Sequence, residues 1–307
     1  MALDKQLENL LSEVADIHDV PQGAYSLRVN GTLYGKRSVE NIDIVPKTDK
    51  PGIDIYIKPG TKNESLHIPV LIAETGLNEL VYNDFHIGEG ADVTIVAGCG
   101  IHNGGDKNSS HDGIHSFFVG KNARIKYIEK HYGSGEGKGE RIMNPTTVIE
   151  IDENGYMEMD TCQIKGVDST KRVTTARLQK NATLIVGEKI MTHGTQYAET
   201  EFDVRLDGEG SGTHVVSRSV AKDDSRQLFV SRIHGNSACS GHTECDAIIM
   251  DNARVSAVPE IVANHIDASL IHEAAIGKIA GEQIIKLMTL GLTEQEAEEE
   301  IINGFLK

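Results

Sequence analysis

The sequence predicts a mainly β protein, a parallel β-helix flanked by a short N-terminal helix and a C-terminal helical region. A short turn phrase recurs along the chain in copies that begin at Ile87, Val119, Ile151 and Leu178, spaced 27 to 32 residues apart. The chain contains no Trp and only 5% aromatic residues, which suits stacked aliphatic ladders. A repeat of this length is typical of a solenoid, in which each coil buries its face against the next coil.

Residues 1–22 form the predicted N-terminal helical segment. Pro21 ends its helical pattern. We expect the helix to dock on the core rather than to serve as a handle for a partner protein. Apolar residues recur at three- and four-residue spacing over residues 3–17, on one helical face, at Leu3, Leu7, Leu10, Leu11, Val14 and Ile17.

Residues 23–262 form the predicted β-helix core. Apolar and polar residues alternate over 53–57 and again over 200–206, which predicts half-buried strands. A further copy of the turn phrase begins at Met250. The Gly- and His-rich stretch 98–113 is predicted to be a loop that interrupts the array. A β-sandwich also has strands at regular spacing, but the repeated turn phrase favours the β-helix.

Residues 263–307 form the predicted C-terminal helical region. Apolar residues are distributed helically over 275–290, and Gly291 stands where a left-handed cap would end that helix. Thr293 and Glu296 then match a capping box, which predicts the start of a last helix. We expect a small pair of helices here.

The charge balance restricts the partners of this chain. Thirty Lys and Arg residues stand against 46 Asp and Glu residues, a net charge of −16 in 307 residues. Such a chain repels phosphate backbones and anionic lipid, so we expect no nucleic-acid or membrane partner. It has no apolar run of membrane-spanning length and no signal-peptide pattern. Four cysteines without a CxxC pair indicate a reducing compartment, which predicts a cytoplasmic protein.

Cys245 is the first candidate for chemistry, because His242 and Asp246 stand close to it and Cys239 precedes it by six residues. Thiolate, imidazole and carboxylate together suit zinc, iron or an iron–sulfur cluster. The spacing matches no common zinc-finger pattern, and a small buried thiol on a strand is the plainer alternative.

His272 and Glu273 are adjacent where the core meets the helical region. Neighbouring residues of a strand point to opposite faces, so both could serve one site only at a bend or across an interface. The alternative is the start of a helix with an acidic residue in its first turn.

Four histidines surround the stretch that follows Cys99, and they could form a metal site with its thiol. Their irregular spacing favours a solvated loop instead. These histidines are His102, His111, His115 and His131.

Taken together, the C-terminal third of the chain resembles the SufB and SufD family of iron–sulfur cluster assembly scaffolds. The resemblance is strongest over residues 215–307 and extends loosely to Ala97-Gly-Cys99. Several motifs carry it in order, namely Ser219-Val-Ala-Lys-Asp-Asp-Ser-Arg226, Phe229, Thr243-Glu-Cys-Asp246, Pro259, His272-Glu-Ala-Ala, Lys278 and Gly304-Phe305. The resemblance implies a right-handed parallel β-helix whose C-terminal helices bind a SufC-like ABC ATPase.

The resemblance also implies the roles of particular residues. A transient iron–sulfur cluster would form at the interface of two β-helix subunits, with Cys245, His272 and Glu273 as ligands. Cys99 is similar to a cysteine that takes in sulfur, supplied by a cysteine desulfurase or another donor, and relays it. Since the chain carries both halves of this site, it could work as a homodimer or beside a sister subunit. Ile271 departs from the family, which usually has Glu there.

The function that these features predict is a scaffold that activates a partner ATPase and is not itself an enzyme. The alternative from another class is a carbohydrate-active β-helix enzyme with paired Asp and Glu residues in a groove. The absence of Trp and of a signal peptide counts against that alternative. A third alternative is a protein with a structural zinc ion.

Overall fold

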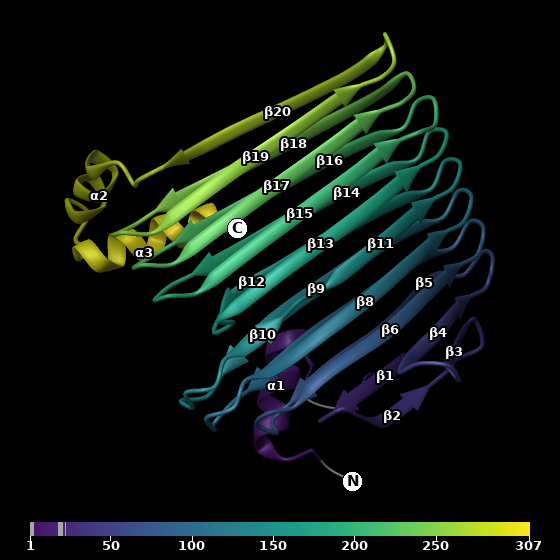
Figure 1. The fold of residues 1–307 in the computed structure, drawn as a ribbon, viewed down its shortest axis with the longest axis horizontal. Helices are drawn as coiled ribbons and strands as arrows, with labels where there is room; N and C mark the ends of the chain where they lie inside the picture. Colours follow the sequence, from purple (N-terminus) through teal and green to yellow (C-terminus); the bar gives the residue numbers. More distant parts are fainter. Residues whose placement is uncertain (1–2, 18–20, 22) are drawn as a thin grey trace.

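The computed structural model describes residues 3–17, 21 and 23–307. Two ten-stranded sheets, here called sheet A and sheet B, face each other, and each coil of the chain adds one strand to each sheet (Figure 1). Within the stack, neighbouring strands pair in parallel. The chain therefore forms a parallel β-helix of about eight coils, as the turn phrase predicts.

The strands of sheet A are, in spatial order, β2 (Thr32–Arg37), β1 (Ala24–Val29), β5 (Lys62–Ile72), β7 (Asp92–His102), β9 (Arg124–Ser134), β12 (Tyr156–Lys165), β14 (Thr183–Thr192), β16 (Gly212–Ala221), β18 (Cys239–Ile249) and β20 (Ala268–Gly277). The strands of sheet B are β19 (Arg254–Ala263), β17 (Arg226–Gly235), β15 (Tyr197–Leu206), β13 (Ser169–Leu178), β10 (Arg141–Met143) with β11 (Thr146–Ile151), β8 (Ser109–Val119), β6 (Asn78–Ile87), β4 (Gly52–Ile57) and β3 (Ile42–Pro46).

The recurring turn phrase marks one corner of the coils. Ile87, Val119, Ile151 and Leu178 are successive ladder neighbours in sheet B. Each is followed by a turn residue with positive φ, which is Gly in one copy and Asn in the next three. Those asparagines stack, and the side-chain amide of Asn181 donates to Asn154, which in turn donates to Asn122. The copy that begins at Met250 instead lies at the opposite corner, where the chain leaves sheet A.

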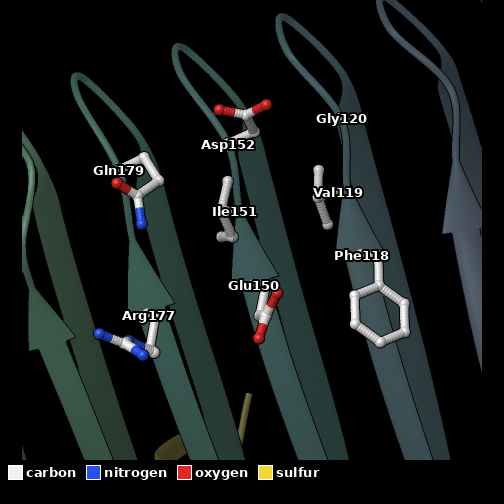
Figure 2. Close-up of a pocket in the computed structure, with 8 residues that line it drawn as sticks. All are labelled: Phe118, Val119, Gly120, Glu150, Ile151, Asp152, Arg177 and Gln179. Atoms are coloured by element: carbon white, nitrogen blue, oxygen red, sulfur yellow. The ribbon is translucent and has the colours of Figure 1, made fainter.

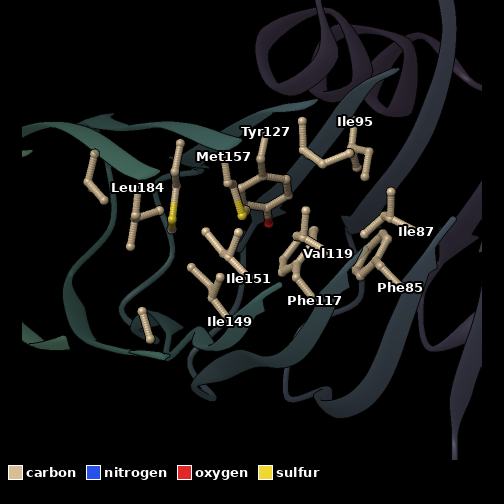
Figure 3. Packing of buried hydrophobic residues seen from close by; sticks show 14 of the residues in the cluster. Phe85, Ile87, Ile95, Phe117, Val119, Tyr127, Ile149, Ile151, Met157 and Leu184 are labelled. Atoms are coloured by element: carbon tan, nitrogen blue, oxygen red, sulfur yellow. The ribbon is translucent and has the colours of Figure 1, made fainter. Parts of the chain in front are cut away.

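Aliphatic and aromatic side chains fill the space between the two sheets (Figure 3). Phe85 stacks on Phe117 with ring centroids 4.3 Å apart, and Tyr127 meets Phe117 edge-on. The isoleucines, valines and leucines of successive coils lie above one another, so each coil buries the apolar face of the coil before it.

The N-terminal helix α1 (Lys5–Ala15) docks on sheet A, as predicted. Its buried leucines and Val14 pack against β1 and β5. Gly98 allows the close approach, since a Cβ there would lie 2.6 Å from the carbonyl oxygen of Val14. The predicted segment boundary at residue 22 lies outside the described residues. No helix in the described part of the chain is long and apolar enough to cross a membrane.

The C-terminal region differs from its prediction at its start. Residues 268–277 form β20, which continues sheet A, so the helix expected over 275–290 is confined to α2 (Gly281–Met288). In β20 the inward positions recur at every second residue and stack on β18, and this ladder outweighs the helical spacing of the isoleucines. The capping box of Thr293 and Glu296 is confirmed at the start of α3 (Glu294–Phe305), and Gly291 has a positive φ.

The loop expected over residues 98–113 is wrong for most of its length. Residues 98–102 belong to β7 and 109–113 to β8, so only a short connection between them is irregular. In β7 the residues Gly98, Gly100 and His102 share the outer face, whereas His111 and Gly113 of β8 face the interior. The array is therefore continuous through this region.

Candidate functional site

Cys245 lies on β18 with its side chain inside the β-helix, and only 1% of the residue is exposed. Its ladder neighbours are Ser217 on β16 and Ala274 on β20. Burial raises the pKa of the thiol to about 12, helped by the charges of Glu188 and Asp246. The thiol is therefore protonated at neutral pH. It becomes a nucleophile or a ligand only when the site opens or a cation displaces the proton.

His272 also faces the interior, in the last strand of sheet A. Its Nδ1 lies 2.6 Å from the hydroxyl oxygen of Thr243 on β18. Burial, and after it the nearby His242, lowers the pKa of His272, so the imidazole is neutral at neutral pH. His272 stands two residues before the ladder neighbour of Cys245. The imidazole and the thiol are thus diagonal neighbours on one face, a donor pair suited to iron or zinc.

Glu273 points to the opposite face of β20, and 67% of its side chain is exposed. It is the ladder neighbour of Glu244, and its Oε2 lies 3.8 Å from Nε2 of His242. The structure thus brings Cys245 and His272 together and separates Glu273 from them. The alternative in which His272 and Glu273 begin a helix is wrong, since both lie in the middle of a strand.

The other cysteines lie apart from this pair, and all four are free thiols. Cys99 is buried on the inner face of β7, where burial and the charges of Glu79 and Glu129 raise its pKa well above the usual value. Five ladder steps separate β7 from β18, a distance of about 24 Å at the usual strand spacing. Cys99 and Cys245 are therefore out of direct contact. Cys162 is half-buried and Cys239 is buried at the start of β18.

A buried polar row links the interior beside Cys99 to Cys245. Its members are ladder neighbours on the inner face of five successive strands of sheet A, in the order Glu129, Thr161, Glu188, Ser217 and Cys245. His131, the ladder neighbour of Cys99, lies with Nε2 3.6 Å from Oε1 of Glu129. We did not expect this row. Reading the sequence in columns at its own repeat of 27 to 32 residues aligns these five residues.

Arg172 on β13 neutralises the row from sheet B. Its guanidinium donates to Glu129, and its Nε lies 3.7 Å from Oε1 of Glu188. Burial opposes ionisation of Glu129, but the charge of Arg172 holds the pKa of that carboxyl well below its usual value. Burial wins at Glu188 and raises its pKa, although Ser217 donates to it over 2.7 Å. One cation thus serves two buried carboxyl groups of different acidity.

Three of the four predicted histidines face the interior instead of a solvated loop. His111, His115 and His131 are each at most 7% exposed. His115 has buried partners for both ring nitrogens, the hydroxyl of Tyr127 at 2.8 Å from Nδ1 and the amide of Asn83 at 3.2 Å from Nε2. Burial lowers the pKa of His115 to about 4. In the described residues, no three donors drawn from these histidines and Cys99 lie within reach of one ion.

A shallow pocket of about 430 Å³ lies on the outer surface at a corner of the coils (Figure 2). It offers two carboxylates, as the carbohydrate-active alternative requires. Asp152, however, accepts a 2.7 Å hydrogen bond from the backbone of Glu153 and so is engaged in the turn. The residues that line the pocket are Phe118, Val119, Gly120, Glu150, Ile151, Asp152, Arg177 and Gln179.

The fold and the site define a class of protein, a parallel β-helix with a buried thiol and a half-buried imidazole in its last two coils. Residues 78–305 match the family model described as the SufBD core domain of the SUF system for FeS cluster assembly. The chain belongs to the SufBD family of iron–sulfur cluster assembly proteins. The resemblance of the motifs between Ser219 and Phe305 is thereby confirmed.

Curated relatives agree with this assignment. An iron–sulfur cluster assembly SufBD family protein of Methanocaldococcus jannaschii is 29% identical, over 82% of this chain and 79% of its own length. One from Archaeoglobus fulgidus is 32% identical, over 84% of this chain and 69% of its own length. One from Methanothermobacter thermautotrophicus is 29% identical over 83% of this chain, and the match spans 62% of that longer relative.

Proposed function

We propose that this protein is a scaffold on which a nascent iron–sulfur cluster forms at the interface of two β-helices. The observation that carries the proposal is the placement of Cys245 and His272 on the inner face of the last two strands of sheet A. The thiol and the imidazole supply soft and borderline ligands, and neither is far from the end of the stack. The cluster is the cargo of the scaffold, which assembles it and passes it on.

The open end of the stack supports dimer formation. β19 and β20 are the last strands of their sheets, so each leaves one edge of backbone groups that no strand of the described residues covers. Exposed apolar side chains accompany these edges, including Val258, Ile261 and Ile271, which are 43 to 50% exposed. Such an edge favours pairing with a second strand edge. A homodimer, or a pair with a sister subunit, would cover it.

A dimer interface would also explain how Glu273 could be a ligand although it faces away from Cys245. Because Glu273 faces away from Cys245 within one chain, it would reach the cluster from the partner copy or after a bend in β20. This arrangement keeps Cys245, His272 and Glu273 as the proposed ligands.

The C-terminal helices are the proposed docking site of a SufC-like ABC ATPase. α3 is anchored on the β-helix through Ile302 and Leu306, which pack against Val220. α2 has no buried residue; Ile285 within it is 62% exposed, and Leu290 just after it is 73% exposed. An anchored pair of helices with free apolar side chains suits a partner protein. ATP-driven closure of two such ATPases would open the interface and expose the buried thiol of Cys245. The scaffold would in turn activate the ATPase that it binds.

Cys99 is the proposed entry point for sulfur. Its thiolate would accept the outer sulfur of a persulfide on a cysteine desulfurase or another donor, which breaks the donor's S–S bond and releases its thiol. Direct exchange with Cys245 is excluded by the distance of about 24 Å. Onward movement along the polar row would therefore require a thiol reductant to release the sulfur as hydrosulfide. The free thiols suit the reducing cytoplasm that the sequence predicts.

Anaerobic reconstitution with iron and sulfide tests the cluster proposal. The wild-type dimer with a SufC-like ATPase and ATP should show cluster absorption and Mössbauer signals. Cys245→Ser and His272→Ala should lose most of the cluster while keeping their strand signal in circular dichroism. Cys162→Ser is the matched control, since that thiol lies outside the polar row. Equal cluster yield in Cys245→Ser and the wild type would refute the site.

Comparing two sulfur sources tests the proposed role of Cys99 in sulfur entry. Cys99→Ser should fail with a cysteine desulfurase and cysteine but succeed with inorganic sulfide. Failure with both sources would show that Cys99 is needed for the fold or the cluster itself, and success with both would exclude an entry role.

A further inference from the structure

Two histidines lie side by side on the outer face of sheet A, away from the polar row. His214 on β16 and His242 on β18 are ladder neighbours. Their rings stack with centroids 5.0 Å apart and an angle of 7° between the planes. Both alternate with inward residues, so they point away from Cys245, which lies three residues after His242 on the same strand.

A carboxylate completes the group. Oε1 of Glu244 lies 2.9 Å from Nε2 of His214 and 3.7 Å from Nδ1 of His242. One donor atom of each residue lies within 4.8 Å of the other two, and no other set of three does so among the residues that the structure describes. Glu273 adds a second carboxylate, 3.8 Å from Nε2 of His242. Four donors from three adjacent strands therefore converge on one small region.

One atom of this group lacks a partner. Nε2 of His242 is shielded from solvent and makes no hydrogen bond in the described structure. A shielded polar atom without a partner costs free energy, and a bound cation would offset that cost. Its closest carboxylate belongs to Glu273, at a distance too long for a hydrogen bond but short enough for both to bind one ion.

We propose that His214, His242 and Glu244 form a binding site for a divalent transition-metal ion, with Glu273 as a fourth donor. Two imidazoles and one carboxylate are the ligand set of non-haem Fe²⁺ and of many Zn²⁺ sites. Small side-chain movements would bring these donors to about 2.1 Å from one ion. The site contains no thiol and lies on the other side of sheet A from Cys245. That Fe²⁺ is the ion bound in the cell rests on the proposed function, which consumes iron.

Cobalt tests the site directly, because Co²⁺ reports its own ligands by absorption. Titrating the anaerobic full-length protein with Co²⁺ should give visible ligand-field bands without a thiolate-to-cobalt charge-transfer band. His214→Ala and His242→Ala should each weaken binding at least about tenfold, and Glu244→Gln should do so without a change of ring packing. Cys245→Ser should keep both the bands and the affinity. A large excess of Fe²⁺ should displace Co²⁺ from the wild-type protein, since such sites usually bind Fe²⁺ more weakly than Co²⁺.

His234→Ala is the matched control. His234 lies on the outer face of sheet B with Nε2 3.5 Å from a carboxylate of Asp203, and among the described residues it belongs to no group of three donors. The His234→Ala variant should bind Co²⁺ with the affinity of the wild type. Unchanged affinity in His214→Ala and Glu244→Gln, or a charge-transfer band that Cys245→Ser removes, would overturn the proposal. Because Co²⁺ binding is measured without sulfide or ATPase, its outcome is independent of cluster assembly.

Discussion

The hydroxyl of Thr243 lies 2.6 Å from Nδ1 of His272, on the strand next to that histidine. If the proposed cluster were bound through Nε2, Nδ1 would carry the proton and donate a hydrogen bond to this hydroxyl, which would fix the orientation of the ring. The contact would therefore orient His272 as the proposed ligand.

Thr243→Val should loosen that ligand without removing it. We expect the cluster to be lost to a chelator about 10 to 100 times faster, since the partner of the ring is gone. Thr243→Ser keeps the hydroxyl and should behave as the wild type. Chelation monitored by visible absorption checks this. Identical rates in the valine and serine variants would show that the contact does not orient the ligand.

Arg172→Met should destabilise the β-helix strongly, because it leaves Glu129 and Glu188 without their shared cation. Breaking a buried ion pair by removing one partner costs about 3–5 kcal/mol. Urea unfolding of the variant should show this loss in the free energy of unfolding. The triple variant Glu129→Gln, Arg172→Met, Glu188→Gln should recover much of it. No recovery would mean that Arg172 stabilises the interior by packing rather than by charge.

The buried carboxyl of Glu129 predicts a defined dependence of stability on pH. Its folded pKa lies well below 4.5, so its contribution is complete above that value and is lost as the pH falls toward the folded pKa. Glu129→Gln should therefore be less stable than the wild type at pH 7, and this difference should shrink below about pH 4.5. Urea unfolding at several pH values measures it. A difference that grows on acidification would contradict the assigned direction.

Cys245 should resist alkylation in the isolated chain. With a pKa of about 12, its thiolate fraction at neutral pH is about a thousandfold below that of a free cysteine, and burial slows access further. Iodoacetamide labelling followed by peptide mass spectrometry should therefore mark Cys162 first. If an ATPase partner opens the site, ATP should accelerate labelling at Cys245. Rapid labelling of Cys245 in the isolated chain would contradict the closed interior.

Gly98→Val should dislodge α1 from sheet A. Any Cβ at this position meets the backbone of Val14, and β7 cannot move away without breaking its ladder. We expect faster proteolysis within residues 3–17 and a loss of about 1–3 kcal/mol in stability. Gly187→Ala is the control, because its Cβ would meet only the side chain of Asp160. Equal protection of α1 in both variants would show that the helix tolerates the shift.

The periodicity of the sequence made the fold predictable. The chemistry of the interior was less predictable, because it depends on which side chains the coils bury next to one another. The turn phrase from Ile87 onward located the corners, because left-handed turns require Gly, Asn or Asp at fixed positions. The strand nature of 268–277 was hidden, since isoleucines at Ile271 and Ile276 fit a helix as well as a strand. The apolar residues of α1 and the capping box of α3 were readable because both follow local rules.

The site was only partly predictable for a related reason. Cys245 and His272 were candidates from their neighbours in the sequence, and the resemblance joined them in one site, but which of His272 and Glu273 faces inward depends on the register of β20. Glu129 and Glu188 were missed because acidic residues are common in this chain, and only their stacking across coils separates them from surface carboxylates. His214 was missed because its partners lie on the next strand of sheet A, some thirty residues away in the sequence.

The stacked asparagines at the corner also limit how the length of such a chain can change. Adding or removing a single residue inside a strand would turn the side chains that follow it in that strand to the other face. The repeat of 27 to 32 residues shows that the corners absorb differences of several residues. Changes of length should therefore fall at the corners or comprise a whole coil. The span from Glu129 to Glu188 is an exception, because Arg172 requires both carboxyl groups at their present separation. Natural variation by whole coils should spare that span.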